Sequence, residues 1–380
     1  MPFALYILGL AIFAQGTSEF MLSGLVPDLA ADLDLSISAA GSLTPAFAAG
    51  MIIGAPLMAI VSLRWPRRRA LLVFLTVFLA VHVLGALTGS FAVLLFARIV
   101  GALANAGFLA VALAAAAAMV GPDAKGRATS VLLGGITAAC VAGVPAGALL
   151  GQVWGWRSAF WAVALLSVPA LVAIVRSVPD AAPDAAVPDA REELRVIRGR
   201  PVLLVLTVGA LVNGGTFCTF TYLAPLITDV AGFGDAWVPA LLALFGIGSF
   251  AGVNAAGRLA DTRPDRVVEA GGAALLAGWI LFAVTAGSPA ATVVLVLVQG
   301  TLSFAVGSTL ISQALYAAVA APALAGGFAT AAFNVGAALG PALGGLAIGA
   351  GLGYRSPLWV SAALVAAALV ALRTRIRVSR

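Results

Sequence analysis

Two charged residues interrupt long apolar runs of the sequence. Glu19 lies in the run 4–26 and Arg98 in the run 92–117. An ionised side chain near the centre of a bilayer costs about 2.5–3.5 kcal/mol on insertion scales, so it needs a partner or a task. If both runs are helices, a rise of about 1.5 Å per residue places Glu19 roughly 10 Å and Arg98 roughly 9 Å below the same outer surface. We hypothesise that they meet and that Glu19 carries a transported proton; the alternative is a static pair that only fixes packing.

The remaining reactive side chains do not form a pattern typical of an enzyme. His82, the only histidine, lies at a comparable depth in the run 70–88. We expect it to be a packing residue, with proton transfer as the alternative. Cys140 and Cys218 lie in apolar runs without metal-ligand spacing, and the sequence has no nucleotide-binding loop or nucleophile–base set. The sequence therefore predicts no enzyme, metal or cofactor. Active transport by this chain would use an ion gradient, unless a separate subunit provides the energy.

The composition indicates a membrane protein. Hydrophobic residues make up 62% of the chain and charged residues 9%, against about 45–50% and about 25% in soluble domains. Such a chain cannot cover itself with polar side chains, so lipid is the expected solvent. The net charge of +6 does not indicate nucleic-acid binding, because the basic residues are scattered between apolar runs.

Apolar runs of about 20 residues can cross a bilayer as helices. The sequence contains twelve, so the predicted fold class is an all-α polytopic membrane protein with six helices in each half; eleven or thirteen helices are the alternatives. All but three of the 21 lysines and arginines fall on loops of one side, and the positive-inside rule makes that side, with both termini, cytoplasmic. The approximate limits of the runs are 4–26, 39–62, 70–88, 92–117, 127–151, 157–176, 202–226, 237–260, 268–286, 290–314, 325–350 and 356–373.

The two halves share one register. Similar seven-residue segments, Gly155–Trp161 and Gly353–Trp359, are 198 positions apart. The same offset relates four further pairs of identical residues: Gly16 and Gly214, Pro27 and Pro225, Pro66 and Pro264, Arg68 and Arg266. This offset predicts a duplicated six-helix bundle.

The predicted bundles are 1–176 and 202–380, the second with a short basic tail, and 177–201 is a cytoplasmic linker rich in proline, alanine and charge. The duplication does not extend to the buried charges. At the shared offset Glu19 corresponds to Phe217 and Arg98 to Val296. We therefore expect ion coupling in the first half and mainly substrate contacts in the second.

One loop motif resembles the signature between the second and third helices of each half in the major facilitator superfamily. The better copy contains Gly257 and Asp261, followed by Arg266; the first half has a degenerate copy with Arg64 and Arg68, in which a leucine replaces the acid. The resemblance implies that these residues take part in gating at the cytoplasmic side, with an acid-based latch only in the second half.

Glycine and proline motifs narrow the resemblance to the twelve-span drug:proton antiporters of that superfamily. The residues that match the antiporter motif or its looser first-half version are Gly336, Gly340, Pro341 and Gly344, with Gly143, Pro145 and Gly147. Glycines four apart let helices approach closely, and proline favours a bend, so the resemblance implies a gating role for both helices.

Three longer runs, Gly16–Phe20, Gly24–Asp28 and Gly147–Arg157, are similar to actinobacterial chloramphenicol-resistance exporters and to arabinose-efflux-permease-like proteins. This similarity implies a proton-coupled exporter of small neutral amphiphilic antibiotics in the bacterial inner membrane. Chloramphenicol-type phenicols are the expected substrates. The alternatives are a sugar or nucleoside exporter of the same fold, an uncoupled facilitator and a membrane sensor.

A neutral amphiphilic substrate requires an apolar cavity with a few polar anchors. For each candidate the alternative is an interhelical hydrogen bond or packing contact. The expected partners are the small-molecule substrate, protons and membrane lipid, with no nucleic acid, and the protein is expected to be a monomer. The candidate cavity residues are Gln15, Asn105, Asn213, Phe217, Phe220, Tyr222 and Asn334.

Overall fold

The computed structural model describes residues 2–62, 65–120, 125–178, 195–196, 198–259, 264–318 and 325–378. Within these residues the regular structure is helical and contains no strand. Twelve helices in this part of the chain are long and apolar enough to cross a membrane, as the sequence predicts. Most of the linker 177–201 lies outside the described residues.

The described residues form two compact units, one within 1–35 and 46–185 and the other within 36–45 and 186–380. The first contains α1 (Phe3–Phe20), η1 (Met21–Gly24), α2 (Val26–Asp32), α5 (Arg67–Leu87), α6 (Phe91–Ala118), α7 (Lys125–Ala138), η3 (Ala139–Gly143), α8 (Val144–Trp154) and α9 (Arg157–Ser177). Helix α4 (Leu43–Ser62) begins in the segment of the second unit and continues in the first.

The second unit contains α3 (Ile37–Gly41), α11 (Arg200–Thr221), α12 (Leu223–Pro225), η4 (Leu226–Val230), η5 (Asp235–Trp237), α13 (Val238–Leu259), α14 (Pro264–Thr285), α15 (Pro289–Ala317), α16 (Ala325–Ala347), η6 (Ile348–Leu352) and α17 (Ser356–Val378). Ser38 Oγ of α3 donates a hydrogen bond to the carbonyl oxygen of Gly345 on α16, 2.7 Å away. The beginning of the second span therefore packs with this unit.

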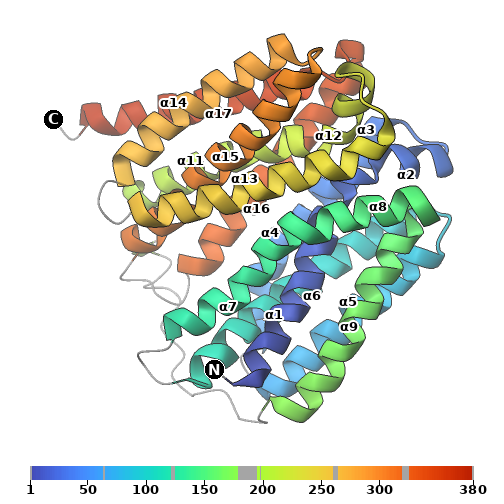
Figure 1. Ribbon diagram of the computed structural model, residues 1–380. Helices are drawn as coiled ribbons and strands as arrows, with labels where there is room; N and C mark the ends of the chain where they lie inside the picture. Colours follow the sequence, from blue (N-terminus) through green and yellow to red (C-terminus); the bar gives the residue numbers. More distant parts are fainter. Residues whose placement is uncertain are drawn as a thin grey trace. The chain divides into compact units, whose positions relative to one another are not determined.

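The same helix packing occurs in both units. Helix α1 packs against α7 and α9, and α5 packs against α6 and α9 (Figure 1). In the second unit α11 packs against α16 and α17, and α14 packs against α15 and α17. The corresponding helices lie about 198 positions apart, so the structure supports the duplication that the shared register predicts.

The repeated seven-residue segment forms the same turn in both units. Gly155 and Gly353 have φ angles of 79° and 72°, in a region that residues with a side chain rarely adopt. Arg157 Nη2 then donates to the carbonyl oxygen of Thr88 at 3.2 Å. Arg355 Nη2 lies 2.9 Å from where a Cβ of Gly287 would be. Each arginine thus lies at the start of the last helix of its unit, beside the turn between the third and fourth spans, and in the first unit it is hydrogen-bonded to that turn.

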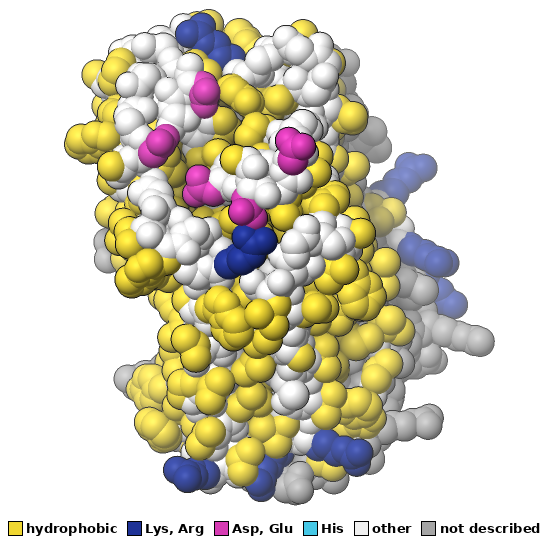
Figure 2. Space-filling view, turned by 90° about the vertical axis from the view of Figure 1, so that its right-hand side faces the viewer, with side chains coloured by type: hydrophobic (Ala, Val, Ile, Leu, Met, Phe, Trp, Pro, Cys, Tyr) yellow, Lys and Arg dark blue, Asp and Glu magenta, His cyan; other side chains and the backbone are white. Residues whose placement is uncertain are grey.

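Large apolar side chains cover much of the surface. Phe96, Leu165 and Leu346 are 60%, 66% and 68% exposed, and the face in Figure 2 has broad continuous hydrophobic areas. A soluble monomer rarely exposes so much contiguous apolar surface. Together with the twelve spans, this surface identifies a multi-pass membrane protein whose helices face lipid.

Candidate functional site

Helix α1 packs closely against the fifth span because small residues line the contact. A Cβ on Gly16 would lie 3.0 Å from Cβ of Ala139, and a Cβ on Gly143 would overlap Oγ1 of Thr17. Gly147 is less restricted, because its Cβ would make an ordinary contact. The approach of the two backbones brings η3 beside the buried polar residues of α1.

The π-helical turn η3 has a local cause in the sequence. Pro145 has no backbone N–H and cannot complete the regular hydrogen-bond pattern of an α-helix. The N–H of Val144 bonds to the carbonyl oxygen of Ala139, five residues earlier, which is the π-helical pattern. Such turns occur often at functional sites. The proline of the predicted gating motif therefore marks an irregular turn that packs against α1, the helix of Glu19.

Arg98 reaches α1 as the sequence analysis expects, but its contacts to Glu19 go to the backbone. Its Nη1 donates to Ser18 O at 2.9 Å and to Ser18 Oγ at 3.0 Å. Its Nη2 donates to Glu19 O at 3.3 Å. The guanidinium lies 4.2 Å from the centre of the Phe47 ring. Arg98 is 2% exposed, so these contacts hold it inside the unit.

The side chain of Glu19 lies among polar groups from two helices. Its carboxylate interacts with the Arg98 charge and with the Asn105 side chain. Asn105 also contacts Met51 Sδ through Nδ2, at 3.5 Å. Gln15, one helical turn before Glu19, is buried, and neither of its amide atoms has a hydrogen-bond partner in the described part of the chain. These residues form the first unit's polar site, which has free hydrogen-bonding capacity at Gln15.

Two residues that the sequence analysis did not assign to the site complete it. Ser18 Oγ lies 2.6 Å from His82 Nε2, and His82 Nδ1 lies 2.6 Å from Phe78 O. The imidazole also packs on the Phe78 and Phe160 rings, with centroids 4.1 and 5.9 Å away. His82 thus has the expected packing contacts and, in addition, a hydrogen bond that links it to Arg98 through Ser18.

In the second unit, the polar cavity candidates use their donors in bonds to the backbone. Asn213 Nδ2 donates to Phe333 O at 2.7 Å, and Tyr222 Oη donates to Pro341 O at 3.0 Å. Asn334 Nδ2 donates to the backbone of its own helix, at 3.0 Å. These contacts correspond to the alternative role, hydrogen bonding within or between helices.

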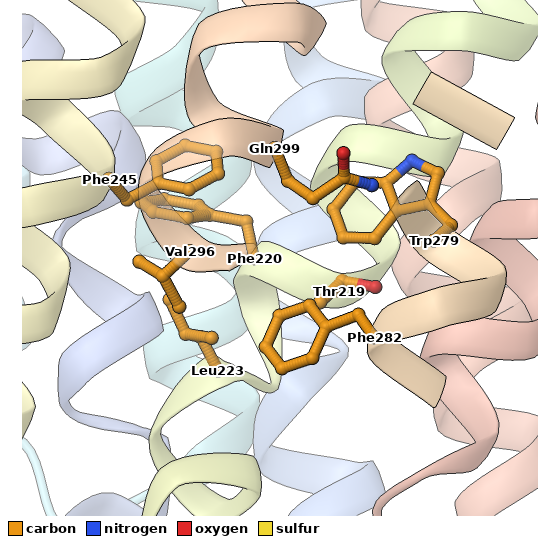
Figure 3. A pocket seen from close by; sticks show the side chains of 8 residues that line it. All are labelled: Thr219, Phe220, Leu223, Phe245, Trp279, Phe282, Val296 and Gln299. Atoms are coloured by element: carbon orange, nitrogen blue, oxygen red, sulfur yellow. The ribbon is translucent and has the colours of Figure 1, made fainter. Parts of the chain in front are cut away.

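Of the aromatic candidates, Phe220 lines a small pocket whose wall comes from α11, α12, α13, α14 and α15 (Figure 3). Phe220 packs on Phe245 with ring centroids 4.7 Å apart and on Phe217 at 6.0 Å. Trp279 Nε1 and Gln299 Oε1, in the pocket wall, are buried without a partner among the described residues. Phe220 therefore faces an aromatic pocket with two unused polar atoms.

The glycine motif of the second unit brings α16 against α11. A Cβ on Gly336 would overlap the carbonyl oxygen of Ala210, and a Cβ on Gly340 would overlap that of Gly214. Gly344 continues the row, with Tyr222 and Cys218 beside it. The motif therefore permits backbone contact between two helices, which is what glycines four apart provide.

The predicted cytoplasmic latch falls largely outside the described residues, since Arg64 and Asp261 belong to the parts left out. Arg68 is half-buried in the first turn of α5, Arg266 is exposed in the first turn of α14, and Gly257 lies near the end of α13. The positions of Arg68 and Arg266 agree with the shared register. Their gating role remains a prediction.

The first unit also contains an ion pair that the sequence did not reveal, between α2 and the first residue of α9. Arg157 Nη1 donates to Asp32 Oδ2 at 2.6 Å, and Trp156 Nε1 donates to the same oxygen at 3.1 Å. These two hydrogen bonds, from Arg157 foremost, hold the pKa of Asp32 below its ordinary value. The pair connects α2 to the beginning of α9.

Comparison with known proteins assigns this fold to a large group of transporters. A family model described as Major Facilitator Superfamily matches residues 8–326. The chain is 53% identical over 373 residues to a chloramphenicol resistance protein of Streptomyces lividans, covering 97% of this chain and 95% of that one. It is 34% identical over 354 residues to the inner membrane transport protein YdhP of Escherichia coli, covering 93% and 90%. The putative transporter AraJ of Escherichia coli is 25% identical over 366 residues, covering 96% and 93%.

Two solved structures have the same fold. A bacterial homologue of the human lysosomal transporter Spinster, in an inward-facing and unoccupied conformation, has a TM-score of 0.72 at 17% identity, covering 97% of this chain and 94% of that chain. The human organic anion transporter MFSD10 has a TM-score of 0.70 at 18% identity, covering 97% and 98%. At this identity the likeness concerns the fold alone.

Proposed function

Because the chain belongs to the major facilitator superfamily, we propose that it is a proton-coupled efflux transporter of small neutral amphiphilic antibiotics. The family and the transporter relatives indicate a transporter rather than an enzyme. The name of the Streptomyces lividans relative, a chloramphenicol resistance protein, favours export and a phenicol as the substrate.

The observation that carries the proposal is the carboxylate of Glu19, which lies within the first span beside Arg98 and Asn105. A carboxylate in this position exchanges a proton only when its surroundings change, because burial disfavours the charged form and a nearby guanidinium favours it. In alternating access the site opens to one side of the membrane at a time. Opening to the outside hydrates Glu19 and lets it take up a proton, and the inward-open state releases that proton.

The polar site also supports recognition of a neutral substrate. Gln15 and Asn105 present amide groups that both donate and accept hydrogen bonds, and Phe47 and Met51 add apolar surface. These groups suit hydroxyl and amide groups on an apolar molecule. A substrate bound there lies next to Glu19, so its binding and the proton compete for one region.

We further propose that the protein works as a monomer in a bacterial inner membrane, with lipid around its spans and both termini in the cytoplasm. The distribution of lysine and arginine supports this orientation. In the proposed antiport, protons enter the cytoplasm while the drug leaves it.

Everted membrane vesicles from a host without its own drug pumps test the proposal. Wild-type protein should accumulate a labelled phenicol only while a proton gradient is maintained. Glu19→Gln keeps the size of the side chain and removes the exchangeable charge, so accumulation should stop while drug binding in detergent stays measurable. Asn254→Ala is the control, because Asn254 is exposed and, within the described part of the chain, donates to Phe250 O in its own helix.

Drug-induced proton release in weakly buffered detergent is the direct measurement of coupling. Release should occur with the wild type and be absent with Glu19→Gln. Equal release from both proteins would show that a group other than Glu19 carries the proton. Equilibration of the drug across the membrane without a proton gradient would indicate an uncoupled facilitator. Transport of sugars or nucleosides instead of phenicols would show that the protein is a sugar or nucleoside exporter.

A further inference from the structure

A chain of hydrogen bonds runs from Arg98 to the backbone of α5. Arg98 Nη1 and Ser18 Oγ are 3.0 Å apart, Ser18 Oγ and His82 Nε2 are 2.6 Å apart, and His82 Nδ1 and Phe78 O are 2.6 Å apart. Arg98, Ser18 and His82 are 2%, 0% and 3% exposed. The three side chains come from α6, α1 and α5, so the chain connects three helices.

The partners at the two ends fix the direction of donation. A carbonyl oxygen only accepts, so His82 Nδ1 carries the hydrogen in its bond to Phe78 O. Arginine only donates, so Ser18 Oγ accepts from Arg98. In a neutral imidazole Nε2 is then an acceptor, and the hydroxyl hydrogen of Ser18 points to it. Donation runs from Arg98 to Ser18, to His82 and to the α5 backbone.

The second unit lacks the histidine and the arginine of this chain, and its hydroxyl, Thr216 Oγ1, donates instead to Val212 O at 3.0 Å. At the shared offset of 198 positions, Thr216 replaces Ser18, Ile280 replaces His82 and Val296 replaces Arg98. Phe47, which lies under the guanidinium, has an aromatic counterpart in Phe245, and this ring and Val296 both line the small pocket (Figure 3). A histidine that only filled space would not need to occur with the arginine.

We propose that His82 is a positioning residue: through Ser18 it holds the Arg98 guanidinium on the α1 backbone beside Glu19, and it does not carry the transported proton. This inference rests on the proposed coupling role of Glu19. His82 uses both ring nitrogens in the chain, which leaves neither free for exchange with water. Its acceptor at Nε2 keeps the Ser18 hydroxyl from turning to a backbone carbonyl of its own helix, so one lone pair of Ser18 stays directed at Arg98.

The test compares variants that keep or remove the acceptor. His82→Leu removes it at similar volume, His82→Gln offers an amide oxygen in its place, and Ser18→Ala removes the middle of the chain. The titratable side chains that face this part of α1 from its described neighbours are His82, Arg98 and Cys140. Transport is measured against pH in everted vesicles, and drug-induced proton release in detergent.

His82→Leu and Ser18→Ala should each move the midpoint of transport upward by roughly half a pH unit or more. The reason is that a guanidinium further from the Glu19 carboxylate favours its ionised form less. The double variant should move the midpoint no further, because both changes break one chain. His82→Gln should keep the wild-type midpoint, and all these variants should still release protons on drug binding.

Loss of proton release in both His82→Leu and His82→Gln would make His82 the carrier and overturn the inference. An unchanged midpoint in His82→Leu and Ser18→Ala would reduce His82 to a packing residue, which also overturns it. If His82→Leu does not reach the membrane, Ser18→Ala decides, since it cuts the same chain from α1. Failure of the proposed function is recognised separately, by wild-type proton release from Glu19→Gln.

Discussion

At the scale of single residues, buried polar side chains of the first unit differ from the exposed ones in what they can do. Arg98 has its guanidinium bonded to α1 and over an aromatic ring, and Glu19 lies beside it. Arg157 and Asp32, in contrast, pair at 2.6 Å with side chains 36% and 44% exposed. An exposed pair is screened by water and contributes at most about 1 kcal/mol to stability. Glu19 and Arg98 are therefore the candidates for coupling, and the exposed pair is structural.

The Asp32 pair predicts a small pH dependence of stability. Because its hydrogen bonds lower the pKa of Asp32, the contribution of the pair is complete above the ordinary pKa of about 3.9 and is lost as the pH falls through the lowered value. Thermal unfolding of the purified protein should show a difference between wild type and Asp32→Asn at about pH 6 that shrinks as the pH falls below the ordinary pKa of about 3.9. Asp34→Asn, an equal charge change at an exposed residue two positions on, is the control. Equal effects of both substitutions at every pH would contradict a specific role of the pair.

At the scale of helices, glycine decides which spans touch through their backbones. The first and fifth spans meet at Gly16 and Gly143, and the seventh and eleventh meet at Gly336 and Gly340. Because the same pairs of spans approach in both units, closeness here is a property of the duplicated design. Helices that pack without intervening side chains shift together, which suits elements that must move as one body during transport.

Gly340→Ala tests this packing. The added Cβ would overlap the carbonyl oxygen of Gly214, and overpacking of this kind costs about 1–3 kcal/mol. Gly327→Ala on the same helix α16 is the matched control, because nothing lies within 4 Å of a Cβ at that position. Unfolding temperatures in detergent should fall for Gly340→Ala and stay the same or rise for Gly327→Ala. Similar changes in the two proteins would show that backbone contact at Gly340 is not needed.

At the scale of the whole chain, the duplication reproduces the packing of the helices but not their chemistry. Both units pack their helices in one pattern, and both place an arginine of the repeated segment beside the turn between the third and fourth spans. Among the described residues only the first unit has a buried arginine, which lies beside Glu19, while the second has an aromatic pocket around Val296. The first half is therefore suited to bind and release the proton, and the second half to supply apolar contacts to the substrate.

The orientation of the chain predicts which residues a reagent can reach. Single cysteines are introduced into a protein in which the buried Cys140 and Cys218 have been replaced. An impermeant thiol reagent added to intact cells should label Asp34→Cys and Asp235→Cys, and should label Arg198→Cys only after the membrane is opened. The reason is that lysine and arginine are retained on the cytoplasmic side. Ready labelling of Arg198→Cys in intact cells would reverse the proposed topology.

The sequence by itself determined the membrane class, the twelve spans and the duplication, because each follows from local composition or from a fixed register. It also identified Glu19 and Arg98, since a charge in an apolar run needs no tertiary information to stand out. The glycine motifs were visible for the same reason, because four-residue spacing places residues on one face of a helix.

Only the tertiary structure decided the partners of these residues. Ser18 and His82 are 64 positions apart and carry no motif, so their hydrogen bond became visible only when α1 and α5 packed together. The same holds for the use of Asn213 and Tyr222 in helix–helix bonds, because a polar side chain within a span has the same appearance in sequence whether it faces a cavity or another helix. Side-chain partners depend on how helices rotate about their axes, and that rotation is set by packing across the whole unit.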